Sequence, residues 1–221
     1  MAFELSFLAK FQAAFALGLW MTIRITVVCV ILGTALGFVT GLARTSRNPF
    51  VRGVATVYVD VFRGTPVLIQ LFWFFFCLPL ILGTDLPNFV SACVALTLYM
   101  GAITSESFRS SLRQVGREQM DACVALGLPR RARIMNVILP QAVLRAIPPL
   151  LSNAISLFKE SALVSAVGVA DLMFIGQNIS NNTARPVEVL TIVALIYFVI
   201  AFPLTRLVTV AEQKMLRKIA A

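Results

Sequence analysis

The chain has 221 residues, of which 59% are hydrophobic and only 13% are charged, and its formal net charge is +9. A soluble domain is about 45–50% apolar and about 25% charged, so this composition excludes an ordinary soluble core and indicates a single integral membrane domain. There is no histidine, which excludes a Ser/His/Asp triad and a histidine-ligated metal site.

Five apolar runs are long enough to cross a bilayer as helices, because a span needs roughly twenty mainly apolar residues. They cover residues 14–42, 54–82, 89–108, 141–175 and 187–210, and a polar loop at 176–188 separates the last two. The sequence therefore predicts an all-α integral membrane fold with five transmembrane helices, in which residues 1–221 form one transmembrane domain.

The first span carries one charge, Arg24, and three glycines, Gly33, Gly37 and Gly41. The glycines recur every four residues, so they share one helix face, and faces of small residues let helices approach closely in membranes. We interpret them as packing glycines. For Arg24 two alternatives stay open, because it can face a substrate cavity or extend to the outer interface of the membrane.

The second span is interrupted by FRGTP, residues 62–66, where glycine and proline together weaken a helix. Asp60 and Arg63 are three residues apart and share one helix face. We expect them to form a local ion pair with a structural role, and a role as a gate is the weaker alternative. Gln70 follows on the same segment and is assigned to the same gate or structural group.

Residues 118–140, the longest stretch without a plausible span, are rich in arginine and begin with a short helical pattern. Residues 118–126 can form about two turns, with Glu118 and Asp121 near the positive end of the helix dipole. Gly127 suits a C-terminal stop, and Pro129 suits the first turn of a second short helix. Such a half-apolar helix fits a groove on another protein, and the alternative is a surface helix that only buries its own apolar face.

Polar and charged residues lie inside the fourth span, where an ionisable group costs about 2.5–3.5 kcal/mol on insertion scales. Asn153 and Ser156 precede Glu160 on the same helix face, while the adjacent Lys159 points elsewhere. We expect this polar stripe to line a substrate cavity or to form a structural hydrogen-bond network between helices. In the first case Glu160 and Asn153 bind an ammonium group or a side chain. Arg24 then pairs with Glu160 or binds a carboxylate.

Most lysines and arginines fall on one side of this five-span arrangement, around residues 44–52 and 109–133 and in the C-terminal tail. The excess of positive charge in cytoplasmic loops then puts the N-terminus in the periplasm and the C-terminus in the cytoplasm. Topology accounts for the basic residues, so no nucleic-acid partner is expected.

Three motifs in order resemble one known family. DACVALGLPRRARIMNVILP (residues 121–140) resembles the EAA motif, E-A-A-x3-G-x9-I-x-L-P, of the membrane subunits of bacterial binding-protein-dependent ABC importers. YVDVFRGTPVLIQLFW (58–73) is similar to the F-R-G-T-P-x-x-x-Q-L signature of the polar amino acid subfamily. LFKESALVSAVGVADL (157–172) resembles its K-[DE]-[TS]-S-L segment, with alanine at position 162 where serine is usual. The EAA motif is matched at Ala122, Gly127, Leu139 and Pro140 and differs at Asp121, Cys123 and Val137.

The resemblance implies a type I ABC importer permease fold in the bacterial inner membrane, with a cytoplasmic coupling segment at about residues 118–135. It implies these partners: a cytoplasmic ABC ATPase dimer, a periplasmic solute-binding protein, a second permease subunit (identical or sister) and membrane lipid. ATP and Mg²⁺ are expected on the ATPase, since this chain has no GxxxxGK[ST] phosphate loop and no cofactor or metal of its own is expected. The residues assigned to ATPase coupling are Glu118, Asp121, Ala122, Gly127, Arg130 and Arg131.

The resemblance also implies ATP-driven import of a polar amino acid by alternating access, without enzyme activity in this chain. Arg24, Lys159 and Glu160 favour an acidic or neutral amino acid such as glutamate, aspartate or glutamine, and an ectoine-like or opine-like compound is an open alternative. An ion-coupled secondary transporter is expected to show internal repeats of its spans, and none is seen. An intramembrane enzyme needs a nucleophile and a base, and no such constellation is visible. The residues assigned to the substrate pathway are Arg24, Asn153, Ser156, Lys159 and Glu160.

Overall fold

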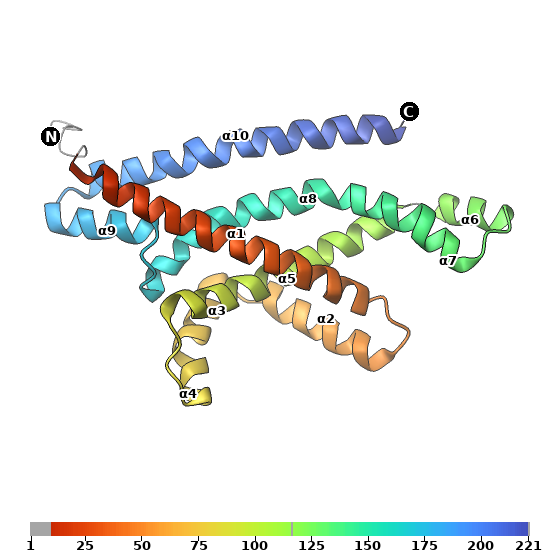
Figure 1. The fold of residues 1–221 in the computed structure, drawn as a ribbon, viewed down its shortest axis with the longest axis horizontal. Helices are drawn as coiled ribbons and strands as arrows, with labels where there is room; N and C mark the ends of the chain where they lie inside the picture. Colours follow the sequence, from red (N-terminus) through yellow and green to blue (C-terminus); the bar gives the residue numbers. More distant parts are fainter. Residues whose placement is uncertain (1–9, 116, 221) are drawn as a thin grey trace.

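The computed structural model describes residues 10–115 and 117–220, without the side chains of residues 117, 118 and 214–220. All regular elements in these ranges are helical (Figure 1). In chain order they are α1 (Gln12–Ala43), α2 (Pro49–Gly64), α3 (Val67–Phe72), the π-helical turn η2 (Trp73–Cys77), α4 (Leu78–Leu82), α5 (Asn88–Gln114), α6 (Arg117–Ala125), α7 (Arg130–Ala132), the π-helical turn η3 (Arg133–Ile138), α8 (Leu139–Glu160), the 3-10 helix η4 (Ser161–Val167), α9 (Leu172–Thr183) and α10 (Pro186–Ala220).

Four helical stretches are long and apolar enough to cross a membrane: Gln12–Ala43, Asn88–Gln114, Arg130–Val167 and Pro186–Gln213. The helices Pro49–Gly64 and Val67–Leu82 add a fifth when this pair, bent by 108°, is taken as one span. The prediction of an all-α membrane fold with five spans, the second of them broken at FRGTP, is therefore confirmed.

The predicted fourth span, residues 141–175, is too long. α8 ends at Glu160, η4 follows, and Gly168 adopts a φ of 74°, a left-handed conformation that favours glycine. Asp171 then caps α9, because its Oδ1 accepts a hydrogen bond from the backbone N–H of Phe174 at 2.9 Å. The apolar run is thus divided between two helices, and most of the predicted polar loop 176–188 is helical in α9.

α1 and α5 pack closely against each other in the middle of the fold. A Cβ atom added to Gly33 would lie 2.6 Å from the Cβ of Met100, and one added to Gly37 would lie 2.5 Å from the Cβ of Thr104. Both distances are shorter than carbon atoms tolerate, so the two backbones approach to where only glycine fits. The interpretation of these two glycines as packing residues is confirmed, whereas Gly41 makes only ordinary contacts.

The outer helices define two distinct ends of the molecule. α8 packs against both α5 and α10, and α2 packs against α5. α6 and α7 project at one end, at the right of Figure 1, while α9 lies at the other end. α10 begins beside α9 and runs back towards the side of α6 and α7.

Candidate functional site

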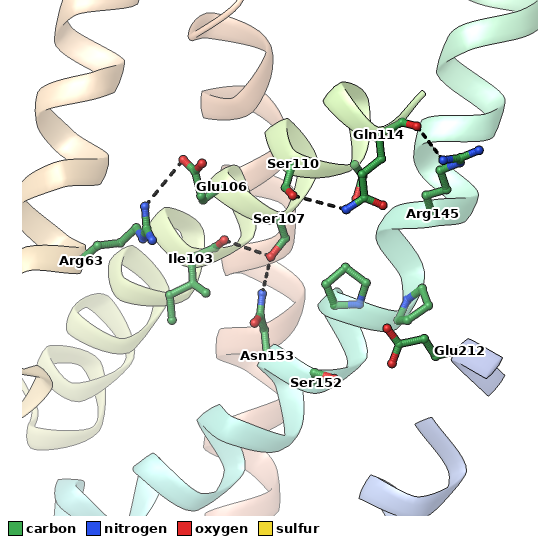
Figure 2. Close-up of a pocket in the computed structure, with 13 residues that line it drawn as sticks. Arg63, Ile103, Glu106, Ser107, Ser110, Gln114, Arg145, Ser152, Asn153 and Glu212 are labelled. Carbon is green, nitrogen blue, oxygen red and sulfur yellow. Dashed lines mark hydrogen bonds and ion pairs between the residues drawn. The ribbon is translucent and has the colours of Figure 1, made fainter. Parts of the chain in front are cut away.

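A polar cavity of about 460 Å³ lies between α2, α5, α8 and α10 (Figure 2). Such a volume is within the range of about 300–1,000 Å³ that is usual for small-molecule sites. The wall is rich in hydroxyl, amide and charged side chains, which is typical of a functional pathway in a membrane protein. The residues that line the polar cavity are Arg63, Ile103, Glu106, Ser107, Ser110, Ser111, Gln114, Arg145, Pro148, Pro149, Ser152, Asn153 and Glu212.

Asn153 joins α8 to α5 across one wall of the polar cavity. Its Nδ2 donates to the hydroxyl oxygen of Ser107 at 2.9 Å, and that hydroxyl donates to the carbonyl oxygen of Ile103 at 3.2 Å. The amide therefore both lines the cavity and links two helices. The two interpretations of Asn153 that the sequence left open, a cavity residue and a member of an interhelix network, are compatible.

The other members of the predicted polar stripe lie outside the wall of the polar cavity. Glu160 accepts a hydrogen bond at Oε1 from the hydroxyl of Tyr99 at 3.1 Å, and its Oε2 is buried without a partner among the described residues. Lys159 is exposed and Ser156 is half-buried. The cavity wall therefore includes Asn153 but not Ser156 and Glu160, which share its predicted helix face, and Lys159 also lies outside the wall.

Arg24 lies near the start of α5 rather than beside Glu160. Its guanidinium carbon is 5.0 Å from the ring centre of Phe89, and its side chain is exposed. Because Glu160 instead contacts Tyr99, the structure does not bring together the predicted pair of Arg24 and Glu160.

Glu106 is the charged centre of the site, and helix spacing in the sequence does not predict this role. The Nη1 atoms of Arg44, Arg63 and Arg109 lie 2.7, 3.6 and 3.7 Å from its Oε2. The predicted ion pair between Asp60 and Arg63 is wrong, because Arg63 turns to Glu106 and Asp60 is exposed. A signal was available, since Glu106 is the lone acidic residue of the third predicted span and stands one turn before an arginine.

Gln70 supports the sharp bend between α2 and α3. Its Nε2 donates to the carbonyl oxygen of Phe62 at 2.8 Å, and to the carbonyl oxygen and the hydroxyl of Thr65 at 3.0 and 2.7 Å. Carbonyl groups that lose their helical partners at a break must find others when they are buried. The buried Gln70 side chain provides those partners, which is a structural role.

The predicted docking segment has the expected local form. The helix α6 ends at a turn in which Gly127 has a φ of 66°, its N–H bonds to the Val124 carbonyl at 2.9 Å, and the N–H of Leu128 bonds to the Cys123 carbonyl at 3.1 Å. These bonds are those of a glycine C-cap, so the prediction that Gly127 ends the helix is confirmed. Pro129 is the N-cap of α7, directly before Arg130.

Apolar side chains are exposed on α6 and on the residue that directly follows it. Met120, Val124 and Leu126 are 38, 54 and 76% exposed, while Cys123 is buried against the rest of the chain. The assigned coupling residues Asp121, Ala122, Gly127, Arg130 and Arg131 are also exposed, and the side chain of Glu118 lies outside the described residues. Within the described part of the chain, no three His, Cys, Asp or Glu side chains are grouped as metal ligands.

Comparison with known proteins identifies the family. The family of binding-protein-dependent transport system inner membrane components matches residues 33–217. The arginine transport system permease protein ArtQ of Bacillus subtilis (strain 168) is 37% identical over 199 residues, covering 90% of each chain. The L-cystine transport system permease protein TcyB of the same organism is 38% identical over 204 residues, covering 92% of this chain and 87% of its own. A putative glutamine transport system permease protein GlnP of Rickettsia felis (strain ATCC VR-1525 / URRWXCal2) is 33% identical, covering 90 and 91%.

Solved structures share the whole fold. The crystal structure of an amino acid ABC transporter with histidines contains a chain that superposes with a TM-score of 0.92 at 31% identity, over 97% of this chain and 100% of that one. A chain of the inward-facing MetNI methionine ABC transporter shares the fold alone, with a TM-score of 0.70 at 23% identity over 91% of this chain and 98% of that one. As the three motifs indicated, the chain belongs to the inner-membrane components of binding-protein-dependent transport systems, with the type I ABC importer permease fold.

Proposed function

We propose that this chain is the membrane-spanning subunit of an ATP-driven importer that carries a polar amino acid from the periplasm to the cytoplasm by alternating access. The observation that carries the proposal is the exposed apolar surface of α6, formed by Met120 and Val124 and continued by Leu126 directly after the helix, beside the turn at Gly127. Relatives named for arginine, cystine and glutamine transport support an amino acid as the substrate class.

The proposed orientation in the bacterial inner membrane puts the N-terminus in the periplasm and the C-terminus in the cytoplasm. It is supported by arginines that follow α1, at Arg44, Arg47 and Arg52, and by those that flank α6. Cytoplasmic loops of membrane proteins are enriched in lysine and arginine. In this orientation α6 and α7 face the cytoplasm, where ATP is available.

In this proposal α6 docks on a cytoplasmic ABC ATPase, which works as a dimer and binds ATP and Mg²⁺. An amphipathic helix gains stability when its apolar face enters a hydrophobic groove of a partner. The helical run that starts at Arg130 continues through η3 and α8 to Glu160, and it carries Asn153 on the cavity wall. A movement of the docked segment is therefore passed along one helix to the cavity. The surface assigned to docking comprises Glu118, Asp121, Ala122, Gly127, Arg130 and Arg131.

The polar cavity is the proposed inner part of the substrate pathway. A second permease subunit, identical or sister, completes the pathway, and a periplasmic binding protein delivers the amino acid to the far end. Arg24, Ser156, Lys159 and Glu160 stay proposed pathway residues outside the cavity, and Asn153 is the one that lines it. The Oε2 of Glu160 is buried without a hydrogen-bond partner among the described residues, and such an acceptor is destabilising. A passing substrate could supply the missing donor, which supports Glu160 as a pathway residue.

The substitution Val124→Asp tests the proposal in proteoliposomes that contain the whole importer with its ATPase and binding protein. A carboxylate on the apolar face of α6 cannot enter a groove without a large desolvation cost. We expect ATP-dependent uptake of labelled glutamine, arginine and cystine to fall at least about tenfold, which corresponds to about 1.4 kcal/mol.

A matched control is Val187→Asp at the start of α10. Val187 is 58% exposed, close to the 54% of Val124, but it lies at the end of the molecule away from α6. Uptake by this variant should stay near that of the parent protein. Equal uptake by the parent protein and Val124→Asp would contradict the docking role of α6.

A further inference from the structure

Three arginines share the single carboxylate of Glu106, and they do so unequally. Arg44 lies 2.7 Å away with a side chain only 4% exposed, which is a strong charge-assisted hydrogen bond. Arg63 and Arg109 lie at 3.6 and 3.7 Å, beyond hydrogen-bonding distance. One carboxylate balances one guanidinium, so two of the three positive charges are not neutralised by it.

Arg63 alone of these three arginines lines the polar cavity. Its side chain is 46% exposed, and no hydrogen bond from it is found among the residues that the structure describes. A guanidinium carries five N–H donors in a planar fork, and that fork matches a carboxylate in a bidentate manner. The wall of the cavity thus offers an arginine with its donors available.

The surroundings of Arg63 fit an amino acid rather than a bare anion. Figure 2 shows Arg63 reaching from α2 towards Glu106, and Asn153 reaching from α8 to Ser107, the next residue along α5. Because the Nδ2 of Asn153 is engaged with Ser107, the other end of its amide is an acceptor, which suits an ammonium group. A guanidinium suited to a carboxylate and an amide oxygen suited to an ammonium group therefore flank one turn of α5.

We propose that Arg63 binds the α-carboxylate of the transported amino acid in the polar cavity, and that Glu106, fixed by Arg44, positions Arg63 for this contact. The inference rests on the proposed function and deepens it, because it names the residue that recognises the α-carboxylate of the substrate. Capture of the carboxylate exchanges only the 3.6 Å contact and leaves the 2.7 Å pair intact. Such a contact is easily made and easily released, as a transport pathway requires.

The test measures binding of labelled L-glutamine to the purified permease–ATPase complex, without the binding protein, by scintillation proximity. Competition by unlabelled L-glutamine is compared with competition by its carboxamide, which keeps the ammonium group and the side chain but lacks the carboxylate. L-Glutamate and L-arginine are tested in the same way. The parent complex should prefer the free carboxylate at least about tenfold.

The variant Arg63→Gln should weaken binding at least about tenfold and lose the preference for the carboxylate. Arg63→Lys, which keeps the charge without the planar fork, should lie between the two and guards against a general folding defect. The matched control is Arg109→Gln, which loses an arginine at nearly the same distance from Glu106 but outside the cavity wall, and should bind as the parent does.

The inference is overturned if Arg63→Gln binds as the parent does, if Arg109→Gln loses as much affinity, or if the parent complex binds none of the amino acids. Basal ATP hydrolysis and co-purification of the ATPase are recorded in the same preparations. If both are normal in the parent complex, the proposed function stands and only the role of Arg63 fails. If the ATPase is missing, the proposed function fails first.

Discussion

Glu106 holds together side chains from three parts of the chain, so its removal has a predictable cost. Glu106→Gln would leave Arg44, with a side chain only 4% exposed, without its countercharge. Breaking a buried ion pair by removing one partner typically costs about 3–5 kcal/mol. Because the Glu106 side chain is itself 29% exposed, we expect a loss of stability in detergent below this range but above the about 0–1 kcal/mol of an exposed pair.

A suitable comparison is Arg109→Gln, whose side chain is 34% exposed and whose contact with Glu106 is 3.7 Å long. Pairs of this kind contribute about 0–1 kcal/mol, so this variant should unfold close to the parent temperature. An equal loss of thermal stability in the two variants would show that the pair of Glu106 with Arg44 contributes no more than the exposed contact of Arg109.

Asp171 gives a pH dependence with a definite sign. Burial raises the pKa of its carboxyl from 3.8 to about 6, and hydrogen bonds from the backbone N–H groups of Phe174 and Met173 oppose this shift only in part. A pKa that is raised in the folded state favours folding below the unfolded pKa, and that contribution is lost as pH rises through the folded pKa. The substitution Asp171→Asn would keep the capping oxygen without the ionisation.

Thermal unfolding of the parent and of Asp171→Asn, measured between pH 4 and pH 8, tests this assignment. The stability of the parent relative to the variant should fall between about pH 4 and pH 7 and stay level above that. A difference that is flat across the range, or that rises with pH, would contradict it.

At the residue scale, the sequence was informative about residue types and poor about partners. Asn153, which spacing predicts as a substrate-cavity residue, lines the polar cavity. Helix spacing wrongly pairs Asp60 with Arg63, because it relates only residues within a turn of the same helix. The partner of Arg63 in the structure is Glu106, which lies on another helix. The pair proposed for Arg24 and Glu160 failed for the same reason, since relative depth along two helices is set by packing.

The contact between α1 and α5 allows an element-scale test. In Gly37→Ala the added Cβ would lie 2.5 Å from the Cβ of Thr104, so the two helices must separate. Overpacking of this kind costs about 1–3 kcal/mol, and we expect a corresponding fall in thermal stability.

Gly53→Ala on α2 is the control for this effect, because a Cβ there meets nothing within 4 Å. Alanine is the better helix former by about 1 kcal/mol, so this variant should be as stable as the parent or slightly more so. If both alanine variants behaved alike, close packing between α1 and α5 would not explain the glycine at position 37.

The sequence predicts the start of a helix well where a polar segment gives way to an apolar one. It predicts a boundary poorly where the chain turns within an apolar segment. The starts of α1, α5 and α10 lie within two residues of the predicted starts, whereas α5 and α10 continue past their predicted ends, to Gln114 and Ala220. The break at Gly168 was missed because residues on both sides of it are apolar, although glycine followed by a capping aspartate is a local signal for it. The polar side chains at 176–183 outweigh the helix pattern there, so the sequence predicts a loop where the structure has most of α9.

At the scale of the whole molecule, the family to which the chain belongs implies that it works together with partner proteins. α5 lies in the interior, whereas α8 and α10 keep many apolar side chains exposed, such as Leu151, Leu195 and Phe198. A membrane helix covers such surfaces with lipid or with another helix. This exposure agrees with a second permease subunit and membrane lipid as neighbours, in addition to the ATPase that we propose to bind α6.

The most direct test of the docking claim is affinity purification of the protein from its native membrane in mild detergent, with mass spectrometry of the proteins that accompany it. The parent protein should bring an ABC ATPase and either no other permease or one sister permease. Val124→Asp should bring the permease partner without the ATPase, because only the apolar face of α6 is changed. A stable protein that emerges alone, or an ATPase retained equally by Val124→Asp, would contradict the central role of α6.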